Sequence, residues 1–269
     1  MSAYAEALNR DRWRIYKCEE RLRVVNLGGT AIGTGFAAQR QYIFRVVDTL
    51  RDLTGIGFAR AENLVEATQN TDVFVEVSGI LKANAATLLK TSSDLRLLAS
   101  GPEAGLGEIR LPQRQAGSSI MPGKVNPVMA ECLDMICFQV IGHDTAVMLA
   151  GQAGQLEINV MEPLITHNII HTQELLINFL PVFTARCIVD IQANEAKCRH
   201  YLDRNPILAT FLSRKIGYMQ AADVVDESLR SGKGIPQIAV EKGYLTKQEA
   251  DELFHPESMV RPTYERKEG

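Results

Sequence analysis

The feature that most restricts the fold is a helical pattern that runs from about residue 71 to residue 98. Apolar side chains recur there every three or four residues, which places them on one face of a single helix. They are Phe74, Val77, Leu81, Ala85, Leu88, Leu95 and Leu98. Gly101 and Pro102 then end the segment, because both residue types disfavour a continuing helix. A helix this long buries its apolar face best against other long helices.

The same pattern recurs in other parts of the chain. We expect long helices over residues 2–25, 128–150 and 163–190. No segment shows the alternation of apolar and polar residues that indicates a half-buried strand. After about residue 195 the amphipathic segments become short and are separated by glycines. The sequence therefore predicts an all-α fold, with part of a long helical bundle at residues 1–195 and a small helical C-terminal domain at residues 196–269.

The composition excludes several classes of protein. The 269 residues have a formal net charge of −3, with 23% charged and 46% hydrophobic residues, which argues against a nucleic-acid partner. No uninterrupted apolar run reaches the roughly 18 residues that cross a membrane, so we expect no membrane partner. The five cysteines form no CxxC pair, and their odd number favours free thiols in a reducing compartment. We therefore expect a globular, cytoplasmic protein.

Glycine and proline are so frequent between residues 101 and 127 that no regular element fits there. A loop of this length inside a compact domain is usually functional or disordered. Gly117 precedes a pair of serines, and a glycine in this place lets the backbone bring amide groups close to a bound group. Lys124 and Asn126 follow, and their side chains can hold a carboxylate through hydrogen bonds. The sequence therefore predicts an anion site in this loop.

The string GSSIMPGKVNP, from Gly117 to Pro127, resembles the signature loop of the family that contains fumarases, aspartases, argininosuccinate lyases and adenylosuccinate lyases. Its second half, GKVNP, is most similar to the fumarase/aspartase branch. Further strings match that branch in the same order along the chain. They are NLGGTAIGTG from Asn26, DLRLL from Asp94, the pair Gly101-Pro102, and EINVMEP from Glu157. The resemblance therefore covers essentially the whole chain.

This resemblance implies roles for five residues. Ser118 corresponds to the general base that removes the Cβ proton of a succinyl-type substrate, whereas Lys124 and Asn126 correspond to residues that bind its carboxylates. Ser119 is implied to contact the substrate. Glu131 matches a carboxylate that pairs with an active-site histidine from another chain. A serine can act as a base only if its hydroxyl is held deprotonated, and Lys124 and the loop amides are the available sources of positive charge. No cofactor is implied.

Within the branch, the strings VNLGG and NVMEP are more similar to aspartases than to fumarases. The resemblance therefore implies reversible elimination of ammonia from L-aspartate to give fumarate, and the alternative is the hydration of fumarate to malate. A different class of function also stays open. An inactive helical scaffold or assembly module would use the same apolar helices equally well.

Members of the family are longer than this chain, and they build each active site from three regions of three subunits in a homotetramer. Only one of the three regions is present here, the loop that contains Ser118 and Ser119, which we call the serine loop. The sequence has neither a TSSNMP-like nor a GRTH-like string. We therefore expect that the chain is a fragment of such an enzyme and is inactive alone. The expected assembly is a homotetramer with shared active sites that take a small dicarboxylate.

Two other patterns resemble a phosphate-binding or metal-binding site but lack residues that such sites require. Spaced glycines from Gly28 to Gly35 lack both the lysine of a phosphate loop and a preceding strand, so we expect a structural turn. His167 and His171 have the spacing of metal ligands on a helix, but no HExxH glutamate or third ligand is evident, and we predict no metal. His143 lies where the branch usually has asparagine.

Overall fold

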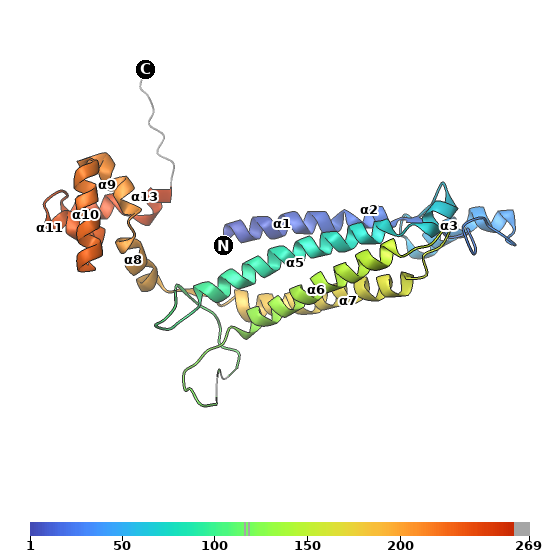
Figure 1. Cartoon of the computed structure of the whole chain (residues 1–269), viewed down its shortest axis with the longest axis horizontal. Helices are drawn as coiled ribbons and strands as arrows, with labels where there is room; N and C mark the ends of the chain where they lie inside the picture. Colours follow the sequence, from blue (N-terminus) through green and yellow to red (C-terminus); the bar gives the residue numbers. More distant parts are fainter. Residues whose placement is uncertain (116, 118, 261–269) are drawn as a thin grey trace, which may run out of the picture. The chain divides into compact units, whose positions relative to one another are not determined.

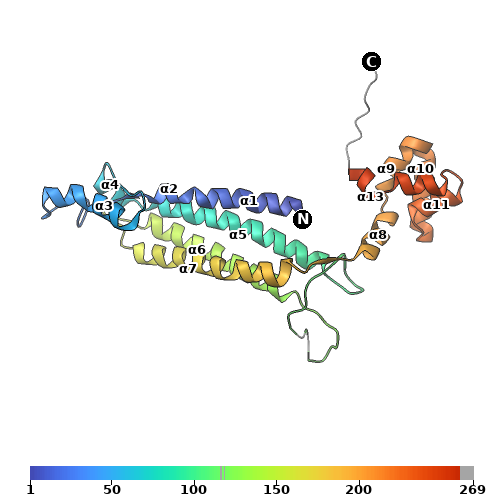
Figure 2. The same ribbon diagram turned by 180° about the vertical axis from the view of Figure 1, so that it is seen from behind.

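The computed structural model describes residues 1–115, 117 and 119–260. It divides into two compact units. Unit 1 comprises Met1–Ser100 and Leu111–Ile191, and unit 2 comprises Gly101–Arg110 and the described residues from Gln192 onward. Both are mainly helical (Figures 1 and 2), which confirms the predicted all-α class. The predicted domain boundary after residue 195 remains a prediction. In the structure the second unit begins at Gln192 and also includes Gly101–Arg110.

Unit 1 contains the long helices together with two short strands. In chain order its elements are α1 Ser2–Tyr16, α2 Cys18–Leu22, β1 Val24–Val25, α3 Arg40–Thr54, β2 Ala59–Arg60, α4 Leu64–Gln69, α5 Asp72–Leu98, α6 Val128–Gln152, α7 Glu162–Phe183 and the π-helix η1 Thr184–Ile188. The helix expected over residues 2–25 is interrupted at Lys17 and ends at Leu22. The helix expected over residues 163–190 ends as a π-helix, shortly after Pro181.

Four of these helices, α1, α5, α6 and α7, form an antiparallel bundle (Figures 1 and 2). The hydroxyl of Tyr4, near the start of α1, donates to Asp94 near the end of α5 at 2.6 Å. Between α6 and α7, Val147 and Ala150 pack against Ile165 in a buried apolar cluster. Five residues of the apolar stripe predicted on α5 are buried in the core: Val77, Leu81, Ala85, Leu88 and Leu95. Of the other two, Phe74 is exposed and Leu98 is half-buried, and both lie near the ends of the helix.

The central helix α6 is apolar on more than one side. By length and composition it could cross a membrane, but its inner face is buried between α5 and α7 and includes the acidic residues Asp134 and Asp144. Its outer face exposes Met135, Phe138 and Leu149 at helical spacing. A helix that is apolar all round is normally covered on every side. The outer face of α6 therefore has the character of a contact surface.

The glycine-rich segment after α2 is a turn, as expected. Gly28 and Gly33 have positive φ angles of 101° and 85°, which side-chain-bearing residues rarely adopt. A Cβ atom on Gly33 would lie 2.3 Å from the carbonyl oxygen of Leu64, so only glycine fits against the start of α4. Strand β1 directly precedes this turn and pairs in parallel with β2. Close backbone packing therefore explains these glycines.

Asn159 joins three helix ends of unit 1. Its Nδ2 group donates to the Thr71 hydroxyl just before α5 at 3.0 Å and to the Ala150 carbonyl near the end of α6 at 2.9 Å. Its Oδ1 atom accepts from the Met161 amide, just before α7, at 2.9 Å. The side chain is almost completely buried. Asn159 thus satisfies backbone groups that helix ends leave without partners.

Unit 2 is a compact group of short helices. Its elements are β3 Ile109–Arg110, β4 Gln192–Ala193, α8 Glu195–Arg204, α9 Leu208–Ile216, α10 Tyr218–Ser231, α11 Ile235–Glu241, α12 Lys247–Leu253 and α13 Pro256–Val260. Leu208, Leu212, Val224, Ile235 and Phe254 form the centre of its apolar core. Thr246 and Glu249 form a capping box that defines the start of α12.

The segment Gly101–Arg110 is held within unit 2 by backbone and side-chain bonds. Strand β3 pairs antiparallel with β4. Asn194 donates from its backbone amide to the Glu108 carbonyl at 2.8 Å and from Nδ2 to the Gly107 carbonyl at 2.9 Å. The Tyr201 hydroxyl donates to the Gly105 carbonyl at 3.2 Å. Unit 2 is therefore discontinuous in sequence.

His143 is buried between α6 and α7 and uses both ring nitrogens. Nδ1 lies 2.9 Å from the Thr172 hydroxyl, and Nε2 lies 2.8 Å from the Gln139 side-chain nitrogen. The His171 ring lies beside it, with 5.1 Å between ring centroids. Burial lowers the pKa of His143 below its ordinary value, and the nearby His171 and His167 lower it further. The folded bundle therefore favours neutral His143.

We expect this histidine to make unit 1 less stable in mild acid. A lowered pKa in the folded state means that the unfolded chain takes up the proton first, so stability is complete above about pH 6.5 and falls as the pH drops through the folded-state pKa. Urea unfolding, followed by the fluorescence of Trp13, the single tryptophan, measures this loss. The variant His143→Asn should lose less stability over the same pH range. An equal loss in both proteins would contradict the assignment.

Candidate active site

The serine loop connects Gly101–Arg110 to α6, and its described part closes on itself at a narrow neck. A Cβ atom on Gly117 would lie 2.0 Å from the carbonyl oxygen of Lys124, so the two backbone segments are in direct contact. The Asn126 side chain ties the neck, since its Nδ2 group donates to the Gly117 carbonyl at 2.9 Å. Gly117 is therefore required for close backbone approach.

A tight turn precedes Lys124. The Lys124 amide lies 3.3 Å from the Met121 carbonyl, and Gly123 has a φ angle of 79°. Proline at the second position and glycine at the third, as in Met121-Pro122-Gly123-Lys124, are the preferred residues of a type II turn. This turn brings the chain back to Gly117 and leaves the Lys124 side chain exposed.

The predicted site residues are placed as follows. Ser118, the expected general base, lies outside the described residues. Ser119 and Lys124 are exposed in the loop, Asn126 is half-buried at the neck, and Glu131 is half-buried in the first turn of α6. Within the described part of the chain, neither the Lys124 ammonium nor the Glu131 carboxylate has an ion-pair or hydrogen-bond partner. Both charges are thus available to a ligand or to another chain.

Asn126, predicted to bind a substrate carboxylate, also holds the neck of the loop together. One of its two amide hydrogens is used to bond Gly117, and a second hydrogen and the side-chain oxygen remain for other partners. The neck therefore fixes the direction in which Asn126 points. Its binding of a substrate carboxylate stays a prediction.

The helix that follows the loop is held in place by two buried carboxylates that the sequence analysis did not single out. Asp134, one turn after Glu131, accepts from Ser92 and pairs with Arg96 at 2.5 Å. Asp144 accepts from Ser78 at 2.9 Å and pairs with Lys82 at 2.5 Å. In each case α5 supplies a serine and a cation four residues later. We call these two groups of residues the α5–α6 clamps.

The cysteines and histidines are the other residue types that could form a reactive or metal-binding site. Burial raises the pKa of Cys137 to about 12, so its thiol is protonated and unreactive at neutral pH. All five cysteines are free. Among the residues that the structure describes, no group of three or more histidine, cysteine or acidic side chains is arranged to hold a metal ion.

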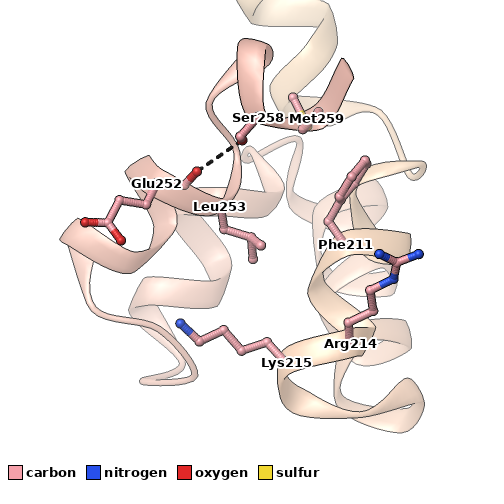
Figure 3. A pocket seen from close by; sticks show the side chains of 7 residues that line it. All are labelled: Phe211, Arg214, Lys215, Glu252, Leu253, Ser258 and Met259. Carbon is pink, nitrogen blue, oxygen red and sulfur yellow. Dashed lines mark hydrogen bonds between the residues drawn. The ribbon is translucent and has the colours of Figure 1, made fainter. Parts of the chain in front are cut away.

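Unit 2 contains an open cavity of about 330 Å³ at the edge of its core. Figure 3 shows the apolar side chains of Phe211, Leu253 and Met259 facing it, with Arg214 and Lys215 projecting from α9 at its margin. None of the predicted site residues that the structure describes lines this cavity.

Comparison with known families decides the classification. Residues 1–142 match a family model described as "Lyase", and residues 208–261 match one described as "Fumarase C C-terminus". The chain belongs to the fumarase/aspartase lyase family. The resemblance seen in the sequence is thereby confirmed, and the serine loop lies within the first matched region.

Curated relatives of this chain include proteins named aspartate ammonia-lyase. That of Bacillus subtilis is 44% identical over 260 residues, which are 97% of this chain and 55% of the relative. That of Escherichia coli K12 is 40% identical over 265 residues, again 55% of the relative. The chain therefore spans about half the length of the curated relatives it matches.

Solved structures of the lyase family have the same fold. A fumarate lyase:delta crystallin from Brucella melitensis, bound to cobalt, superposes with a TM-score of 0.91 at 43% identity. The match covers 97% of this chain and 56% of the Brucella chain. A class II fumarase from Schistosoma mansoni gives a TM-score of 0.80 at 34% identity, and the match covers 97% of this chain and 58% of the fumarase.

Proposed function

We propose that this chain carries the serine loop of a lyase that eliminates ammonia from L-aspartate and forms fumarate. The observation that carries the proposal is the loop itself, whose GSSIMPGKVNP sequence closes at a Gly117–Lys124 neck and leaves the Lys124 ammonium exposed without a partner in the described chain. The relatives named aspartate ammonia-lyase, at 40–44% identity, support aspartate as the substrate.

In the proposed reaction Ser118, as an alkoxide, takes the proton from Cβ of L-aspartate. The electron pair left on Cβ spreads into the neighbouring carboxylate as an enediolate. It then forms the Cα–Cβ double bond as the C–N bond breaks, and ammonia leaves with the C–N electron pair. The doubly charged enediolate is the species that needs stabilisation, and preorganised donors with a lysine provide it best. We assign this role to Lys124, with Ser119 and Asn126 as further donors.

We further propose that Glu131 pairs with a histidine supplied by another subunit, and that the assembly is a homotetramer in the cytoplasm. The apolar outer face of α6, with Met135, Phe138 and Leu149 exposed, supports an assembly because its burial would remove apolar surface from water. Light scattering coupled to size-exclusion chromatography tests the assembly. A monodisperse tetramer is the expected result, and a soluble monomer would contradict it.

The activity is best tested in a chimera, in which this chain replaces the matching 260 residues of the Bacillus subtilis relative. Fumarate formation is followed by its ultraviolet absorbance, with L-aspartate and L-malate as separate substrates. We expect turnover of L-aspartate by the chimera and no fumarate from the chain alone. Turnover of L-malate only would indicate a fumarate hydratase, and a folded, tetrameric chimera without either activity would indicate a scaffold.

The neck of the loop provides a first prediction in this chimera. The variant Gly117→Ala is expected to lower kcat/KM for L-aspartate by roughly a hundredfold, because the new Cβ forces the Lys124 backbone away and displaces the loop. Gly79→Ala is the matched control, since it makes the same change on α5 where no atom lies within 4 Å. Unchanged kinetics in Gly117→Ala would show that the neck is not needed.

A further inference from the structure

Arg114 lies in the limb of the serine loop that precedes Gly117, and it anchors this limb to the end of α7. Its Nε group donates to the backbone carbonyl of Arg186 at 2.6 Å. Its Nη2 group lies 3.3 Å from the Asp190 carboxylate. The Arg114 side chain is 25% exposed, so part of it is covered by the protein. These are the tertiary bonds of the limb Leu111–Gln115 in the described structure.

The acceptor carbonyl is available because of the local helix geometry. Arg186 lies in η1, where the amide of Val189 bonds back to Thr184 in the wide π pattern. The last carbonyls of a helix have no partner within the helix, and a cation near them is favoured by the helix dipole. Single π-turns occur frequently at functional sites. The π-turn therefore presents Arg186 O to the loop.

The two contacts of Arg114 differ in their expected contribution to holding the limb. Asp190 is 62% exposed, and an ion pair in contact with water contributes little. The bond to Arg186 O is shorter, at 2.6 Å against 3.3 Å, and it joins a charged donor to a backbone carbonyl. The carbonyl bond is therefore the main anchor, and Asp190 assists it.

We propose that Arg114 is a positioning residue, which holds the limb of the serine loop on the π-turn so that the Gly117–Lys124 neck is presented to the substrate. The inference rests on the proposed function for its catalytic consequence, although the anchor itself can be measured without activity. Arg114 acts through the Lys124 backbone at the neck and does not contact the substrate. Without the anchor, the limb samples other positions and the binding-competent arrangement becomes a minor population.

Hydrogen–deuterium exchange of peptides from residues 111–127 tests the anchor in this chain. Arg114→Gln should speed exchange of the loop amides by roughly tenfold, because a charge-assisted hydrogen bond is lost. Arg114→Lys should restore part of the protection, and Asp190→Asn should change it little. Arg186→Gln is the matched control, since it keeps the acceptor carbonyl and removes only a side chain. Equal exchange in Arg114→Gln and Arg186→Gln would overturn the proposal.

The kinetic consequence is measured in the chimera. Arg114→Gln should raise KM for L-aspartate by roughly tenfold and leave kcat nearly unchanged, because substrate selects the competent loop arrangement. Partial rescue by Arg114→Lys is expected. A merely structural role would lower kcat through a smaller folded fraction and leave KM unchanged, which would contradict positioning. If the parent chimera does not turn over L-aspartate, the proposed function fails, whereas the exchange experiment still decides the role of Arg114.

Discussion

Replacing Asp134 with alanine is expected to destabilise unit 1 by about 2–4 kcal/mol, because the change leaves a buried serine hydroxyl and a cation without their shared partner. Asp134 is 4% exposed, whereas Arg96 is 43% exposed and can be partly rehydrated, so the loss falls below that for a fully buried pair. Urea unfolding monitored by Trp13 fluorescence gives the change in unfolding free energy.

The second α5–α6 clamp provides an internal control for this prediction. Asp144→Ala should cost a similar amount, and the two residues lie ten positions apart on α6, a distance of about 15 Å along the axis. The double variant should therefore show nearly additive losses. Asp134→Leu tests whether an apolar side chain can replace the carboxylate, since buried ion pairs can sometimes be replaced by apolar residues without loss of stability. A stable Asp134→Ala protein would contradict the assigned role of the clamp.

Replacing Ser118 with alanine is expected to reduce kcat for L-aspartate in the chimera by about 10²–10⁴-fold, the contribution of a well-placed general base. Steady-state fumarate formation measures the loss. KM should change much less, because the carboxylates of the substrate are assigned to Lys124 and Asn126. The size of the effect on kcat therefore tests the proposed base directly.

Two neighbouring substitutions control for damage to the loop. Gln113→Ala removes a side chain that bonds only to the Gln115 carbonyl within the described chain, and it should leave both constants near the parent values. Ser119→Ala makes the same chemical change one residue away from Ser118 and should act mainly on KM. If Ser119→Ala lowers kcat as strongly as Ser118→Ala, Ser118 is not the base.

The helices of unit 1 were predictable because their apolar residues repeat with the helical period over many turns. The stripe on α5 needed no knowledge of partners, since residues such as Val77 and Leu88 are buried in any bundle. The break at Lys17 and the π-turn η1 were not predicted. Both depend on local hydrogen bonding within a region whose residue pattern continues to favour a helix.

The polar contacts within the bundle were harder to predict from a single sequence. Ser92 and Arg96 resemble ordinary surface residues of an amphipathic helix until Asp134 of α6 is placed opposite them. The signal was present as a serine followed four residues later by a cation, twice on α5, with two aspartates in an apolar helix. Arg114 gave no local signal, because its partner is a backbone carbonyl more than 70 positions away.

The chemistry of the serine loop was predicted from its string of residues, whereas its geometry was not. Gly117 was expected to let the backbone bring amide groups close to a bound group, but the structure shows a different requirement, which is room for the Lys124 carbonyl. Asn126 was expected to face a ligand and also ties the neck. Ser118 lies outside the described residues, so its role rests on the resemblance and on the proposed experiments.

The discontinuity of unit 2 restricts how this chain can be divided into pieces for expression. A truncation after Ile191 would seem to remove a C-terminal domain cleanly. It would in fact also remove the β4 partner of β3, together with Asn194 and Tyr201, which bond to the segment Gly101–Arg110. That segment leads directly into the serine loop. Separate study of the bundle therefore requires replacing residues 101–110 with a designed connection as well as deleting the C-terminal helices.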